Sequence, residues 1–122
     1  MLVPMLDAYG ATRLLSSTST RCLSTIQPYA RRQDLRIESY AQLSEEVGAG
    51  DPKGVGRLVQ KIRAATLESG DPTVICVHRP VLPHILSALD IPETTLVTGE
   101  FLVAHLTAEG EVHALERHRP QA

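Results

Sequence analysis

The chain has 122 residues, of which 43% are hydrophobic, and its formal net charge at pH 7 is -2. This length suits one domain with a core of its own, and we expect a single domain over residues 1–122. Lys and Arg never occur in runs longer than two residues, which argues against the basic patch of a nucleic-acid-binding or membrane-surface protein.

The two cysteines, Cys22 and Cys76, stand far apart and outside any Cys-x-x-Cys motif. Neither a disulfide framework nor a metal site is therefore expected, and we interpret both as reduced thiols of a cytoplasmic protein. The apolar start, residues 1–6, has no basic residue and is too short for a signal peptide. No segment approaches the ~20 apolar residues of a membrane span.

Apolar periodicity in the first third of the chain predicts alternating helices and strands. The predicted elements are a helix over 2–9, a strand over 11–15, a helix over 21–30 and a strand over 35–39. Gly10 ends the first helix. A hydroxyl-rich turn over 16–20 follows the first strand, and Ser19 or Thr20 caps the second helix. We expect Pro28 to kink or reset the last turns of that helix.

The remaining two thirds continue this alternation. The predicted elements are a turn of helix after Ser44, a flexible glycine-rich linker over 48–56, a helix over 55–67, a strand over 73–77, a helix over 81–89 and a hairpin of strands over 101–106 and 112–115. The run at 73–77 is apolar and β-branched throughout, which is typical of a strand buried on both faces. Residues 117–122 are expected to be a frayed tail. The order predicts an α/β fold of three layers, α/β/α, with a mostly parallel sheet.

Two polar clusters follow predicted strands, where ligands bind in open α/β sheets. One cluster spans residues 16–21 at a helix start, and the other is His78 with Arg79. Helical N–H groups, hydroxyls and a planar guanidinium suit a phosphate, so we predict a phosphate pocket with Arg21 on one wall and His78 on the other. Each feature also has a purely structural interpretation. Residues 16–21 can be a helix cap, His78 can be a structural histidine, and the pair Glu45 and Glu46 can be a solvated helix face.

Residues 14–25 resemble the Ser-Ser-Pro-x-x-Arg-Ala motif of the histidine phosphatase (phosphoglycerate mutase-like) superfamily. In that family the arginine binds the phosphoryl group, and it matches Arg21, with Ser17 beside it. Thr18 stands where the family has proline, and Cys22 stands where it has alanine.

Two further segments resemble the same family. Residues 43–46 are similar to its Leu-x-Glu segment, whose acid protonates the leaving group; Glu45 is the better match and Glu46 competes with it. Residues 74–78 are similar to the strand that ends in the second family histidine, which matches His78. Arg79 stands where the family often has glycine.

The blocks at 16–22, 76–83 and 99–105 are similar to the C-terminal histidine phosphatase domain of actinobacterial two-domain Nudix hydrolases of the MutT type. That resemblance implies hydrolysis of phosphate esters or nucleotide phosphates, including oxidised nucleotides such as 8-oxo-dGTP, without a cofactor or metal. It implies catalytic roles for His78 and Glu45 and phosphate binding by Arg21, Ser17 and Arg79.

The family opens with a strand ending Arg-His-Gly or Arg-His-Ala, whose histidine takes the phosphoryl group. The segment before the Ser-Ser motif here, residues 1–15, holds no such sequence, and the four other histidines do not fit the role: His84, His105, His113 and His118.

We therefore expect an incomplete domain that lacks the first strand, has an unpaired sheet edge through which it can form a homodimer, and turns over little or nothing alone. A truncated version of a longer protein is the favoured explanation. The alternatives are a non-catalytic phosphate- or nucleotide-binding module and an unrelated α/β interaction domain.

Overall fold

The computed structural model describes residues 2–97 and 99–119, and in these ranges helices alternate with strands as the periodicity predicts. The elements are α1 (Leu2–Tyr9), β1 (Arg13–Ser17), α2 (Thr20–Gln33), β2 (Ile37–Tyr40), the 3₁₀ turn η1 (Ala41–Leu43), α3 (Glu45–Gly48), α4 (Pro52–Ser69), β3 (Thr73–Cys76), α5 (Leu82–Ala88), β4 (Phe101–Leu106) and β5 (Val112–His118). The protein is therefore of the α/β class. None of the helices described is both long and apolar enough to cross a membrane.

A parallel sheet of three strands, in the order β2-β1-β3, forms the centre of the fold. Leu14 of β1 pairs with Ile37 of β2 on one side and with Val74 of β3 on the other. Four of the five residues of β1 are buried, whereas every residue of β3 is only half-buried. Side chains of β3 pack on both faces of the sheet, as predicted for 73–77, with Val74 and Cys76 on one face and Ile75 on the other. They are only half-buried because β3 lies at the edge of the described sheet and has a neighbour strand on one side only.

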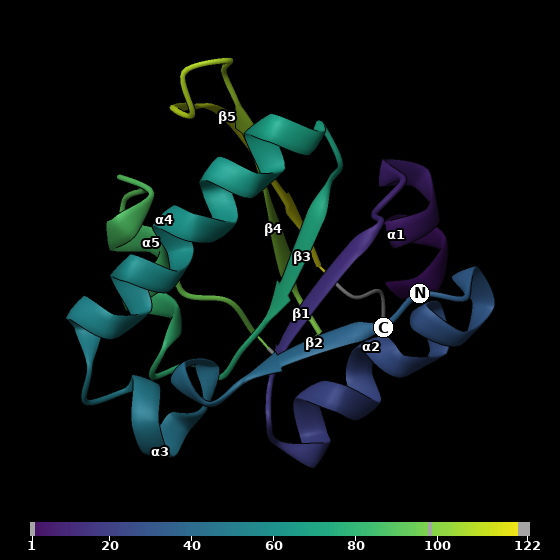
Figure 1. Ribbon diagram of the computed structural model, residues 1–122, viewed down its shortest axis with the longest axis horizontal. Helices are drawn as coiled ribbons and strands as arrows, with labels where there is room; N and C mark the ends of the chain where they lie inside the picture. The colour runs from purple at the N-terminus through teal and green to yellow at the C-terminus, as the bar shows by residue number, and fades with distance from the viewer. Residues whose placement is uncertain (1, 98, 120–122) are drawn as a thin grey trace.

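Helices cover both faces of this sheet, with α1 and α2 on one side and α4 and α5 on the other (Figure 1). Consecutive residues of a strand point to opposite faces, so Leu14 packs against the first pair of helices and Leu15 against the second. The buried core on the first face is Leu6, Ala11, Leu14, Ile26, Tyr29 and Ala30. The buried core on the second face is Leu15, Leu43, Val55, Val59, Ile62, Val81 and Ile85. The three predicted layers are present.

The predicted flexible linker over 48–56 was wrong. Only three residues separate the end of α3 at Gly48 from the start of α4 at Pro52. Asp51 caps α4 by accepting a hydrogen bond from the N–H of Gly54 at 3.0 Å, and proline is favoured at the first helical position. Burial of the valine side chains of this helix outweighs the cost of about 1 kcal/mol that each helical glycine carries.

Pro28 does not end α2, which continues to Gln33. The turn that contains Pro28 also buries Tyr29, whose side chain is only 2% exposed. The Tyr29 hydroxyl donates a hydrogen bond of 2.5 Å to the carbonyl of Ala11, and this bond ties α2 to the start of β1. Packing here exceeds the cost of roughly 3 kcal/mol that an interior proline imposes on a helix.

The predicted hairpin is present as a second, antiparallel sheet made of β4 and β5. It contacts α4 through Arg63, which donates to the carbonyl of Gly110 at 3.3 Å. It contacts α1 through Tyr9, whose hydroxyl donates to Glu116 Oε2 at 2.7 Å. Because β5 runs to His118, the expectation of a frayed tail was wrong for Arg117 and His118; residues 120–122 lie outside the described ranges.

A buried carboxylate holds the segment before β4 against β5. The Glu100 side chain has no exposed surface; Arg117 Nε donates to it at 2.7 Å and Arg119 Nε at 3.0 Å. The N–H of Val97 donates to the same carboxylate at 2.9 Å. These contacts, led by Arg117, lower the pKa of Glu100 from 4.5 to about 2. We call these contacts of Glu100 with Arg117, Arg119 and Val97 the clamp. The clamp explains why β5 continues beyond the end of the predicted hairpin.

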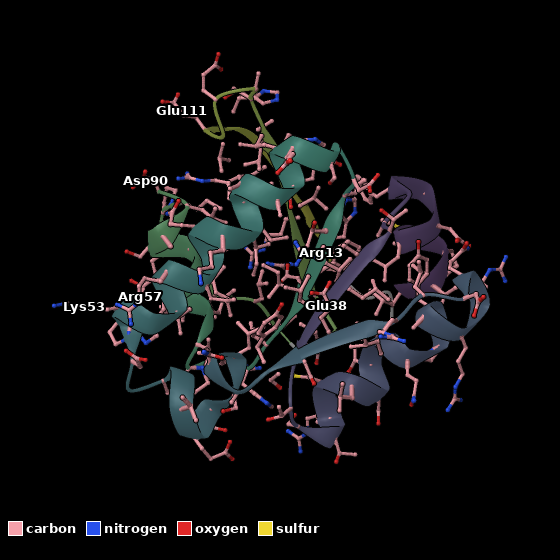
Figure 2. All side chains as sticks on the ribbon, viewed as in Figure 1. Arg13, Glu38, Lys53, Arg57, Asp90 and Glu111 are labelled. Atoms are coloured by element: carbon pink, nitrogen blue, oxygen red, sulfur yellow. The ribbon has the colours of Figure 1, made fainter. Side chains whose placement is uncertain are left out.

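We expect the Glu100→Gln variant to be less stable at neutral pH and to show a flatter acid dependence of stability. A carboxylate whose pKa is depressed by folding stabilises the folded chain fully above pH 4.5, and this contribution is lost as the pH falls toward about 2. Urea unfolding between pH 2 and 6 measures the difference between the two proteins. Glu111→Gln, at an exposed position of the hairpin turn (Figure 2), is the charge-matched control. Parallel acid profiles for Glu100→Gln and the unchanged protein would show that the clamp does not carry this dependence.

Candidate functional site

The parallel sheet brings three predicted site segments to one edge. Ser17 is the last residue of β1, and His78 follows β3 by two residues. Glu45 follows β2 after the short turn η1. Because all three strands run in the same direction, these residues all stand at the carboxyl-terminal edge of the sheet, where α/β proteins bind ligands.

Ser17 and His78 are in direct contact at this edge. The Ser17 hydroxyl oxygen lies 3.3 Å from Nε2 of His78 and also accepts a hydrogen bond of 3.3 Å from the N–H of Ser19. Ser16 and Ser17 are fully buried strand residues, so the predicted turn over 16–20 begins later, at Thr18. The fold therefore brings together the two polar clusters predicted from the sequence. Ser17 and His78, which make this contact, are 61 residues apart in the chain.

The N-terminus of α2 forms the other side of this contact. Ser19 is the N-cap, and its hydroxyl accepts a hydrogen bond of 3.2 Å from the N–H of Cys22. Arg21 lies in the first turn with an exposed side chain, and within residues 2–97 and 99–119 its guanidinium makes no hydrogen bond or ion pair. A helix N-terminus carries a partial positive charge and free N–H groups, and Arg21 adds a full positive charge to it. This end of α2 can therefore attract an anion.

Glu45 and Arg79 stand at the same edge without touching the Ser17–His78 contact in the described part of the chain. Glu45 is the first residue of α3, which Ser44 caps by accepting a hydrogen bond of 3.3 Å from the N–H of Val47. Glu45 and Glu46 are both exposed, and so is Arg79 in the turn after β3. The structure thus joins Ser17 with His78 and leaves these charged side chains open to solvent around them.

Cys22 belongs to the site, although the sequence analysis gave it no role there. Its sulfur lies 3.6 Å from Nε2 of His78. Cys76 lies beside it, and burial, followed by the neighbouring Cys22, raises the pKa of the Cys76 thiol to about 12. The sequence held one signal for a thiol near His78. Cys76 and His78 are two residues apart, so their side chains share a face of β3 and its extension. Each thiol seemed isolated along the chain, and folding brings the two together.

The other histidines for which contacts are described have partners other than Ser17 and Cys22. Nε2 of His84 lies 3.0 Å from the carbonyl oxygen of Ala49, and Nε2 of His105 lies 2.5 Å from Glu116. The His118 ring stacks on Phe101 with 5.1 Å between ring centroids. In the described ranges none of these three histidines joins the Ser17–His78 contact.

A depression of about 420 Å³ lies beside α2 and β2, and none of the predicted site residues lines it. No group of three or more His, Cys, Asp or Glu side chains in the described ranges could hold a metal ion. The candidate site is an edge of the sheet with one partly buried hydroxyl–imidazole contact and exposed charges around it.

Comparison with known proteins relates part of this chain to a curated phosphatase of similar sequence. No protein-family model matches the sequence. Over 99 residues the chain is 35% identical to a protein of Mycolicibacterium smegmatis named 8-oxo-(d)GTP phosphatase. The match covers 77% of this chain but only 30% of the relative, so the chain spans less than a third of the length of the protein that it matches.

Proposed function

We propose that this chain is part of a phosphatase-type domain of the histidine phosphatase (phosphoglycerate mutase-like) fold that hydrolyses nucleotide phosphates. The contact of 3.3 Å between Ser17 and His78, beside the N-terminus of α2, carries this proposal. The name of the relative, 8-oxo-(d)GTP phosphatase, supports a nucleotide substrate and makes oxidised guanine nucleotides the first candidates.

In this proposal the phosphoryl group binds at the carboxyl-terminal edge of the sheet. The Arg21 guanidinium and the first N–H groups of α2 bind its oxygens, and the His78 imidazole donates to one of them. Arg79 adds positive charge from the turn after β3, and Glu45 protonates the leaving group. Such a site accelerates phosphoryl transfer through positioning and electrostatic stabilisation of the transferred group.

The proposed mechanism also needs a nucleophile. In the family that the sequence resembles, a histidine attacks phosphorus and becomes a phosphohistidine, which water then hydrolyses. The 122 residues contain no Arg-His-Gly or Arg-His-Ala sequence, and Nε2 of His78 already contacts Ser17 and Cys22. We therefore propose that a polypeptide of these residues alone binds nucleotide but releases little phosphate. Removing one member of a set of groups that act together costs several powers of ten in rate.

Phosphate release from p-nitrophenyl phosphate, dGTP and 8-oxo-dGTP tests this proposal, with His78→Ala as the paired variant. We expect release at the background rate from both proteins, while dGTP still shifts the NMR signals of residues at the α2 N-terminus. Release that disappears in His78→Ala would contradict the proposed inactivity and show that this site works with His78 as an essential group, which makes His78 the first candidate for the nucleophile. Absence of any nucleotide binding would contradict the site itself.

A further inference from the structure

The two cysteines lie in the interface between β3 and α2. Val74 and Cys76 pack against the core under α1 and α2, whereas Ile75 and Val77 pack on the opposite face. Cys22 is buried in the first turn of α2, on the side of the helix that faces the sheet. Cys76 pairs with Ser16 of β1, one residue before Ser17. Both thiols therefore lie on the same face of the sheet, next to the Ser17–His78 contact.

The two thiols have different surroundings. The Cys22 sulfur is 3.6 Å from Nε2 of His78, so the imidazole can accept its proton. Cys76 is packed against apolar side chains, and this burial raises the pKa of its thiol to about 12. Cys76 is therefore protonated at neutral pH, and Cys22, which has the imidazole beside it, is the thiol expected to react first, because the thiolate is the reactive form.

We propose that Cys22 and Cys76 form a peroxide-sensitive dithiol, in which hydrogen peroxide oxidises Cys22 and Cys76 then closes a disulfide beside His78. Cys22 is only 4% exposed, which restricts the oxidant to a small molecule such as hydrogen peroxide. This modification does not depend on the proposed phosphatase function.

The reaction has two balanced steps. His78 takes the Cys22 proton, the sulfur attacks one peroxide oxygen, and the O–O bond breaks; the leaving hydroxide takes the proton from the imidazolium, which yields a sulfenic acid and water. The Cys76 thiol then gives its proton to the sulfenic oxygen as its sulfur attacks the Cys22 sulfur, so the S–O bond breaks as the S–S bond forms and a second water leaves. The two sulfurs lose two electrons in total, and the peroxide gains them.

Disulfide formation changes the environment of His78. A disulfide holds the two sulfurs about 2.05 Å apart, so Cys22 exchanges its contact with the imidazole for a bond to Cys76. His78 then retains the Ser17 hydroxyl as its described partner. In the oxidised chain we expect the His78 imidazole to take a different position. If the proposed phosphate site is correct, oxidation therefore changes the side of that site that His78 forms.

Thiol counting and mass spectrometry on the reduced 122-residue chain test the dithiol directly. We expect hydrogen peroxide to consume both thiols together, to lower the mass of the monomer by two hydrogens, and to shift the NMR signals of the His78 ring. Dithiothreitol should reverse all three changes. The same treatment of the urea-unfolded chain is the control, and we expect slower disulfide closure there. Unreactive thiols, a gain of oxygen without loss of hydrogens, or disulfide-linked dimers would each overturn the proposal.

Two variants test the order of oxidation, and circular dichroism reports whether each is folded. In Cys76→Ser, the sulfenic acid should persist on Cys22 and be detected as the gain of one oxygen in the intact mass of the chain. In Cys22→Ala, the remaining thiol should react at least about tenfold more slowly, because a buried thiol without a base is inert. An unchanged rate in Cys22→Ala would overturn the role given to Cys22. The mass measurement on the unchanged chain needs neither variant.

Discussion

Replacement of Arg21 by alanine should weaken the binding of dGTP and of inorganic phosphate at least about tenfold, because a hydrogen bond to a charged group contributes roughly 1.5–3 kcal/mol. The Arg21 side chain is exposed in the first turn of α2, and its guanidinium has no protein partner in the described ranges. The substitution removes a cation without leaving a buried group unpaired. We therefore expect the fold and its stability to change little.

Arg31→Ala is the matched control for this measurement. Arg31 lies in the last turn of the same helix with an exposed side chain, so the variant has the same net charge and loses the same groups. NMR titrations of both variants with dGTP and with phosphate compare the two ends of α2 directly. Equal losses of affinity would show that the chain attracts anions through its overall charge. That result would contradict a site at the N-terminus of α2.

Replacement of Gly48 by alanine should destabilise the chain by about 2–3 kcal/mol, which is typical of overpacking against a fixed backbone. An added Cβ would lie 2.1 Å from the carbonyl oxygen of Gln42 and 3.2 Å from Cγ2 of the buried Val81. The carbonyl belongs to the backbone and cannot rotate away, so η1 and α3 must shift. Glu45 lies at the start of α3 and would move with them.

Gly50 and Gly56 lie near Gly48 and provide two controls with different expected effects on stability. An added Cβ meets nothing within 4 Å at Gly50 or at Gly56. Gly50→Ala should change the free energy of unfolding by less than about 0.5 kcal/mol, as surface substitutions usually do. Gly56→Ala lies inside α4 and should raise stability by roughly 0.5–1 kcal/mol, because alanine favours the helix. Urea unfolding of the three variants measures their free energies of unfolding and so checks the predicted order of the three effects. Similar effects at all three positions would show that 48–56 behaves as the linker that the sequence predicted.

The type and order of most elements could be predicted because they depend on local patterns. Helical spacing placed α2 and α4, a β-branched run placed β3, and the turn between two apolar runs placed the hairpin of β4 and β5. Caps acted within a few residues of the helix ends, as at Ser19, Ser44 and Gly70. The predictions failed where distant residues decide the outcome: Arg117 appeared to be a tail residue because its partner, Glu100, stands 17 positions earlier.

The candidate site shows the same division. The sequence by itself determined that hydroxyls, an arginine and a histidine follow two strands, because strand ends and helix starts are marked locally by residue type. Only the tertiary structure decided that Ser17 touches His78, that Cys22 joins them, and that Glu45 and Arg79 remain apart. It also decided that β3 is an edge strand, which its apolar sequence did not indicate. The physical reason is that strand pairing and side-chain contacts across layers are set by packing between segments far apart in the chain, and no local pattern records which segments will meet.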